Sequence, residues 1–123
     1  MRKKQVISFL IQAALLFAVL PAAGQKKIRI TDYGYEPGSR KNVIPALTEA
    51  LKACSSVDSS ILVFPRGRYD FWQDFSSPTY FTTGIPMEGL KNVTLEGDGS
   101  EFIFHGNMQS MNIRECENIR VQN

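Results

Sequence analysis

Two stretches near the end of the chain repeat the same order of apolar and polar positions. Residues 90–95 and residues 116–121 both run apolar, charged, Asn, β-branched, polar or charged, aliphatic, and the offset between them is 116 − 90 = 26. Repeats of this length are typical of solenoids, in which one coil cannot bury its apolar side without a neighbour. The pattern therefore predicts a short strand in each copy and a coil of the same length between them.

The apolar pattern upstream of this repeat changes from strand to helix and back. Residues 26–31 alternate with period two, which predicts a strand with one apolar face. Residues 42–54 carry apolar side chains on one helical face, with Asn42 as the candidate N-cap. Residues 61–64 are continuously apolar, as in a strand buried on both sides, and a second strand over 68–72 follows a Pro-Arg-Gly turn.

The next stretch, residues 73–87, is rich in Ser, Thr, Pro and aromatic residues, and it predicts a long excursion rather than an element. Residues 90–106 predict two strands around a Gly-Asp-Gly turn at Asp98. A link over 107–110, a strand over 111–114 and a last strand over 118–121 follow.

This order predicts a mainly β fold, the start of a right-handed parallel β-helix with one N-terminal capping α-helix. The helix is needed because the first coil has no neighbour to shield its apolar top and its unpaired backbone groups. Asn92 and Asn118 hold the same place in the repeat. Asparagine tolerates turn conformations and can bond its side chain along a stack, so we predict a structural role for both.

The start of the chain, residues 1–24, has the layout of a secretory signal peptide. A basic start at residues 2–4 precedes an apolar run over 6–20, and small residues precede Gln25. We therefore predict export to the periplasm or beyond, with residues 25–123 as the cap and first coils of a truncated β-helix domain. The alternative is an uncleaved anchor, but the run is short for a membrane span. We expect no membrane span in the mature chain.

The net charge of the mature chain bears on the kind of partner it could bind. The chain has 14 Lys and Arg against 12 Asp and Glu, and three of the basic residues lie in residues 1–24, which leaves 11 against 12. A mature chain of this balance gives no reason to expect a nucleic-acid partner.

Cys54 and Cys116 sit at apolar positions, and we interpret them as small buried hydrophobes, although export would allow a disulfide. With His105 as the only histidine, we expect no metal site and no cofactor.

The residues also carry a resemblance to a known family. An Asp-aromatic-Gly motif at residues 32–34, a helix, and a strand leading into Phe-Pro-Arg-Gly-Arg-Tyr at residues 64–69 are similar to the start of pectate lyases and polygalacturonases. A narrower match covers residues 69–72, 88–92, 97–100, 102–106, 108–109 and 116–118. Together these resemble the bacterial α-1,3-galactosidases of glycoside hydrolase family 110, over nearly the whole chain from residue 28 onward.

The resemblance implies an exo-acting, inverting enzyme whose partner is a glycan with terminal galactose. Family members are several times longer, and the resemblance implies that their catalytic carboxylates lie on later coils. Inversion needs two carboxyl groups roughly 6.5–9.5 Å apart. The acids of this chain that come into question are Asp70, Asp74, Glu88, Glu96, Asp98 and Glu101. None matches a family catalytic position, so the catalytic residues are left unknown, and Asp98 between two glycines is interpreted as a turn residue.

An aromatic group could bind sugar. Trp72, with Phe75, Tyr80 and Phe81 nearby, could stack on sugar rings, and Trp72 is the candidate substrate-binding residue; the alternative is packing against the solenoid flank. Asp70 alternates with aromatic residues and is expected to face solvent or bond the neighbouring turn. His105 is interpreted as a hydrogen-bonded turn residue rather than a catalyst.

We predict that the chain is an N-terminal fragment of an exported α-1,3-galactosidase-like enzyme, inactive and poorly stable alone. The alternatives are a small secreted carbohydrate-binding protein without catalysis and a non-functional gene remnant.

Overall fold

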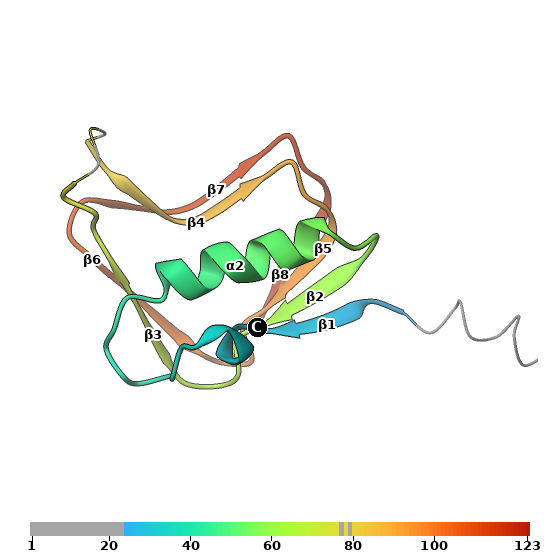
Figure 1. Cartoon of the computed structure of the whole chain (residues 1–123), viewed down its shortest axis with the longest axis horizontal. Helices are drawn as coiled ribbons and strands as arrows, with labels where there is room; N and C mark the ends of the chain where they lie inside the picture. Colours follow the sequence, from blue (N-terminus) through green and yellow to red (C-terminus); the bar gives the residue numbers. More distant parts are fainter. Residues whose placement is uncertain (1–23, 77, 79) are drawn as a thin grey trace, which may run out of the picture.

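The computed structural model describes residues 24–76, 78 and 80–123, and these wind into the start of a parallel β-helix (Figure 1). The predicted signal peptide falls on residues 1–24 and so lies, except for Gly24, outside the described residues. Every paired strand in the described part runs parallel to its neighbour. The mainly β fold predicted from the sequence is confirmed.

Three parallel sheets form the walls of the solenoid. The largest contains, in spatial order, β1 (Lys26–Arg29), β2 (Ser60–Val63), β5 (Lys91–Glu96) and β8 (Glu117–Gln122). The second pairs β3 (Arg68–Trp72) with β6 (Glu101–His105), and the third pairs β4 (Thr82–Glu88) with β7 (Met108–Arg114).

The strand register confirms the predicted coil length and shows one departure from it. Val93 pairs with Ile119 and Ile85 with Met111, and both pairs have the offset of the sequence repeat (119 − 93 = 111 − 85 = 26). Trp72 pairs with His105, for which the offset is larger (105 − 72 = 33). The first coil therefore carries seven extra residues (33 − 26), all of them at the corner between β3 and β4.

A single α-helix among the described residues, α2 (Ile44–Ser55), lies across the end of the first coil (Figure 1). Its apolar stripe is buried against the strands and the 3-10 turn η2 (Ile30–Tyr33), with the buried residues Ala46, Leu47, Ala50, Leu51 and Cys54. These positions recur at the spacing of three and four that one face of a helix requires. The predicted capping role of the helix is thus what the structure shows.

The predicted N-cap is wrong by one position, because Val43 holds that place. The side chain of Asn42 nevertheless serves the helix start. Its Oδ1 accepts hydrogen bonds of 3.2 Å from the backbone N–H of Ile44 and from that of Trp72. Asn42 therefore joins the first turn of α2 to the end of β3. The first predicted strand also ends early, at Arg29, where η2 begins.

The prediction of a structureless excursion over residues 73–87 is wrong for its second half, which forms β4. Ile85 and Met87 are fully buried, and Gly84 and Pro86 hide the alternation in the sequence. The predicted link over residues 107–110 is wrong as well, since β7 begins at Met108. Both strands exist because each pairs with the other, a long-range effect that local pattern does not contain.

The interior is stacked with aromatic rings from successive coils. Phe71 and Phe104 lie face to face with centroids 4.5 Å apart, and Phe64 contacts Phe102 at 4.8 Å. Tyr35 stacks on Tyr69 at 5.5 Å where the loop before α2 closes the coil. Such pairs add about 0.5–1.5 kcal/mol each beyond their buried area, so the stacking helps to fix the register of the coils.

Candidate functional site

Charged and aromatic side chains that could take part in binding or acid–base chemistry lie together on the outer face of the β3–β6 sheet. Tyr69 and Phe71 point into the core, and side chains alternate along a strand, so Arg68, Asp70 and Trp72 point outward. The same alternation places His105 on the outer face of β6, directly opposite Trp72.

Asp70 is the centre of this group and is completely buried. Arg68 donates from Nε to Oδ1 at 3.1 Å and from Nη2 to Oδ2 at 2.9 Å. His105 Nε2 lies 2.7 Å from the same Oδ2. The expectation that Asp70 faces solvent or bonds the neighbouring turn is wrong, because its carboxylate is buried and bonds to Arg68 and His105.

These contacts keep Asp70 ionised. The hydrogen bonds from the Arg68 guanidinium lower the pKa of the Asp70 carboxyl most, burial opposes them, and the bond to His105 lowers the pKa further. The pairing acts on the partner too, since Asp70 raises the pKa of Arg68. A carboxylate with a lowered pKa suits the orientation of a neighbouring imidazole better than the donation of a proton.

Trp72 and His105 stack on each other with ring centroids 3.7 Å apart and an angle of 5° between their planes. Trp72 Nε1 donates to the carbonyl of Arg40 at 3.1 Å, which fixes the indole. His105 is the last residue of β6, so the expectation of a turn residue is wrong, although the expected hydrogen bond is present. The extra length of the first coil hid this pairing from the sequence analysis.

The extra residues of the first coil adjoin this stack. They carry Phe75 and Tyr80, which are 85% and 91% exposed, and Phe81, which is 45% exposed. The alternative expected from the sequence for this aromatic group is packing against the solenoid flank. For Phe75 and Tyr80 the structure shows exposure instead.

The other candidate acids are spread over the described surface. Asp98 has the left-handed φ of 49° expected of the Gly-Asp-Gly turn, and Glu88 and Glu101 are exposed. Bonds from the Ser76 hydroxyl and N–H lower the pKa of Asp74. Bonds from the Asp98 N–H and from two side-chain amides of the next coil lower the pKa of Glu96. These contacts serve turns and coil stacking, and no catalytic pair is assigned.

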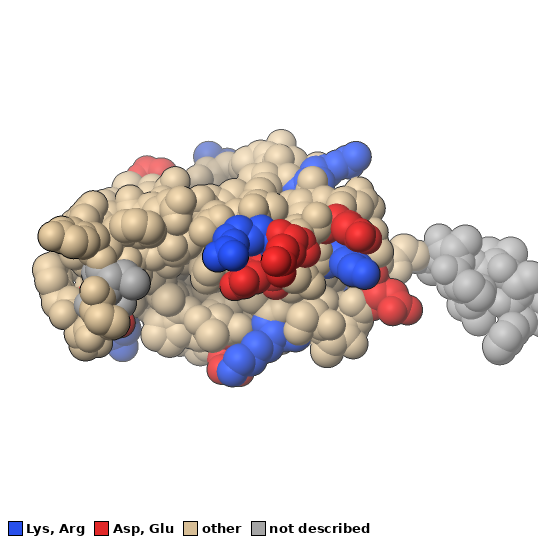
Figure 2. Space-filling view, turned by 90° about the horizontal axis from the view of Figure 1, so that it is seen from above, with Lys and Arg blue, Asp and Glu red and all other residues tan. Residues whose placement is uncertain are grey.

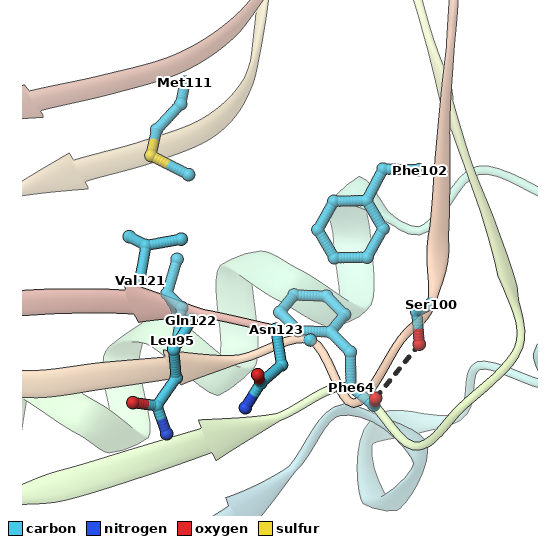
Figure 3. Close-up of a pocket in the computed structure, with 9 residues that line it drawn as sticks. Phe64, Leu95, Ser100, Phe102, Met111, Val121, Gln122 and Asn123 are labelled. Carbon is cyan, nitrogen blue, oxygen red and sulfur yellow. Dashed lines mark hydrogen bonds between the residues drawn. The ribbon is translucent and has the colours of Figure 1, made fainter.

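An apolar cavity of about 310 Å³ lies inside the solenoid next to β8 (Figure 3). Phe64 and Phe102 turn their rings toward it from one side, and Met111 and Val121 from the other. Ser100 Oγ donates to the Phe64 carbonyl at 3.2 Å beside it. The lining holds no acidic or basic side chain among the described residues, so the cavity is part of the coil interior rather than a place for acid–base chemistry.

The described residues show no group of three or more His, Cys, Asp or Glu side chains able to hold a metal ion. Cys54 and Cys116 are both free thiols, and burial raises the pKa of Cys54. None of the helices formed by residues 24–76, 78 and 80–123 has the length and apolar character of a membrane span.

The coils, the capping helix and the outward group at Asp70 place the chain among parallel β-helix proteins, and its sequence relatives make the placement more specific. No protein-family model matches the chain. It is 38% identical to alpha-1,3-galactosidase B of Bacteroides thetaiotaomicron over 90% of its own length, and 39% identical to alpha-1,3-galactosidase A of Shewanella woodyi over 82%. It is 32% identical to an alpha-1,3-galactosidase B of Phocaeicola vulgatus over 86%.

The chain spans only between 18% and 20% of the length of these relatives. The resemblance stated from the sequence is confirmed: the chain is related to the bacterial alpha-1,3-galactosidases and corresponds to a part of them, in keeping with an N-terminal segment.

Proposed function

We propose that this chain forms the capped beginning of the β-helix of an exported enzyme that removes terminal α-1,3-linked galactose from glycans. The observation that carries the proposal is the 38% identity to a protein named alpha-1,3-galactosidase B over 90% of this chain. The capping helix and the stacked coils give the segment a plain physical role. They close one end of the solenoid and set the register for coils that follow.

Alone, the chain is expected to release no galactose. Asp70 is buried against Arg68, and Glu96 bonds the turn at Asp98 and the next coil, whereas inversion needs a separated acid and base around one glycosidic bond. A purified chain that released galactose from an α-1,3-linked digalactoside would contradict this part of the proposal.

A chimera tests the family role directly. Residues 25–123 replace the matching segment of alpha-1,3-galactosidase B from Bacteroides thetaiotaomicron, and galactose release is measured. The chimera should be active because the segment supplies the same cap and coil register. A matched chimera with Leu47→Asp, which puts a charge into the buried face of α2, should lose activity together with folding. A folded but inactive first chimera would overturn the proposal.

Export is supported by the pattern of residues 1–24, which has a basic start, an apolar run and small residues before Gln25. Fusing residues 1–30 to a reporter that is active only outside the cytoplasm tests it. The fusion should give signal and a cleaved N-terminus at Gln25. A fusion with Leu15→Arg and Leu16→Arg in the apolar run should give neither, and equal signal from both fusions would count against export.

A second candidate is a secreted carbohydrate-binding protein without catalysis, which the exposure of Phe75 and Tyr80 favours. The chimera separates the two candidates. An inactive but folded chimera, together with glycan binding by the chain, would favour the second.

A further inference from the structure

The corner between β3 and β4 differs from the corresponding corner of the next coil. The connection from β3 to β4 runs over residues 73–81, whereas only Gly106 and Asn107 connect β6 to β7. Phe75 and Tyr80, which lie in the longer connection, do not pack into the core, because both side chains are exposed. The sequence thus places large aromatic side chains in water at one corner of the solenoid, at an energetic cost that binding of a ligand would offset.

The described surface shows no second aromatic gathering of this kind. Four of its five exposed large aromatic residues are Trp72, Phe75, Tyr80 and Phe81, and only Tyr33 lies elsewhere. Figure 2 shows basic and acidic side chains interspersed over much of one face, whereas the end at which this corner lies is mostly uncharged. Within residues 73–81 the charged residue is Asp74, whose carboxylate is bonded to Ser76. A surface that is otherwise aromatic and uncharged suits a neutral ligand better than a charged one.

The short corner of the second coil holds the base of the longer one in place. Gln73 N–H donates to the His105 carbonyl at 3.0 Å, and Gln73 Oε1 accepts from the Asn107 N–H at 2.9 Å. On the other side, Asn107 Nδ2 donates to the Tyr80 carbonyl at 2.6 Å. Gly106 is favoured here because its φ is 94° and a Cβ would lie 2.9 Å from Gln73 Cβ. The two ends of the aromatic segment are therefore tied to the same short corner.

Polar groups that match sugar hydroxyls surround these aromatic rings. Within the described part of the chain, Gln73 Nε2 and Asn107 Oδ1 have no protein partner, so one donor and one acceptor remain for a ligand. The Thr82 hydroxyl, which accepts from the Asp74 N–H at 2.7 Å, can still donate. Apolar faces beside a few unpaired amide and hydroxyl groups are the features that bind a neutral, hydroxyl-rich ring.

We propose that this corner, built from Trp72, Gln73, Phe75, Tyr80 and Asn107, is a carbohydrate-binding site for galactose-terminated glycans. The choice of galactose rests on the proposed function; the choice of a carbohydrate rests on the corner itself. Phe75 and Tyr80 offer the ring faces. One face of Trp72 is covered by His105, so Trp72 forms the floor of the site.

Trp72 is the only tryptophan of the chain, so its fluorescence reports on this corner alone. The test titrates the purified chain with an α-1,3-linked digalactoside and follows Trp72 emission, with calorimetry in parallel. Binding should saturate. Tyr80→Ala and Phe75→Ala should each weaken it about tenfold, as the loss of one aromatic contact implies. Tyr33→Ala removes an exposed aromatic residue away from the corner and should leave binding unchanged.

Gln73→Glu keeps the shape of the side chain but replaces the free Nε2 donor with a carboxylate oxygen, and it should also weaken binding in a protein whose thermal unfolding is unchanged. Cellobiose in place of the digalactoside tests the sugar preference and should bind more weakly. Saturable binding that none of the corner variants alters would overturn the proposal, as would the absence of binding to a folded chain.

The chain could instead self-associate through this corner. Self-association that is lost in Phe75→Ala and Tyr80→Ala and does not respond to sugar would show that the corner binds a second copy of the chain, and it would overturn the proposal. An active chimera whose corner variants bind normally would overturn this site and leave the galactosidase role standing.

Discussion

Asn118 Nδ2 donates a hydrogen bond of 2.9 Å to Asn92 Oδ1, and the two residues hold nearly the same left-handed backbone conformation, with φ of 53° and 55°. Asn92 Nδ2 in turn donates to the Asp58 carbonyl at 3.0 Å. Asn92 and Asn118 thus hold equivalent corners of successive coils, and the side chain of each donates a hydrogen bond to the preceding coil. This is the arrangement predicted from the repeat.

Asn92 should therefore resist replacement for two separable reasons. Asn92→Gly keeps the left-handed conformation and loses the side-chain bonds, at a cost of about 1 kcal/mol in the free energy of unfolding. Asn92→Ala loses the same bonds and adds the strain of a left-handed alanine, about 1 kcal/mol more. Urea unfolding of both variants measures the difference. Equal stability of the two would show that backbone strain contributes nothing here.

The repeat was visible in the sequence because Asn92 and Asn118 keep one spacing and one local chemistry. The helix was visible for a similar reason, since its apolar spacing is local. β4 was not visible: Gly84 and Pro86 break its alternation, and its pairing with β7 arises only when the coil closes. The site at Asp70 was also missed, because Trp72 and His105 meet at an offset larger than that of the repeat. The seven extra residues between β3 and β4 change the spacing of Trp72 and His105, so their pairing could not be predicted before these residues were located.

The Asp70 carboxyl should make the fold sensitive to acid. Its folded-state pKa lies below the ordinary value of 3.8, chiefly because of Arg68, so its contribution is present above about pH 4. That contribution is lost as the pH falls through the folded-state pKa. Asp70→Asn should lower the free energy of unfolding at pH 7 and flatten its decline below pH 4. Asp32→Asn, on an exposed turn, is the matched control and should leave the acid limb as steep as in the parent chain.

Tyr69 should limit stability at the alkaline end. Burial raises its pKa from 10.0 to about 12, and its hydroxyl donates to the Pro65 carbonyl. A raised pKa means that the contribution is complete below pH 10 and is lost as the pH rises toward 12. Tyr69→Phe should cost about 1 kcal/mol at pH 7 and remove much of the alkaline decline. Tyr33→Phe provides the exposed control, and an identical alkaline limb in both variants would contradict the assignment.

The capping helix should contribute to stability through its buried stripe rather than through its own helix propensity. Leu47 lies in the first turn of α2 and is completely buried, so Leu47→Ala removes packing against the core. The expected cost is about 2–5 kcal/mol. Glu49→Ala lies nearby on the exposed face, where it loses only the ion pair with Lys52, and should change stability by less than about 0.5 kcal/mol. Thermal unfolding of both variants decides between the two sources of stability: similar small losses would mean that the first coil holds together without its cap.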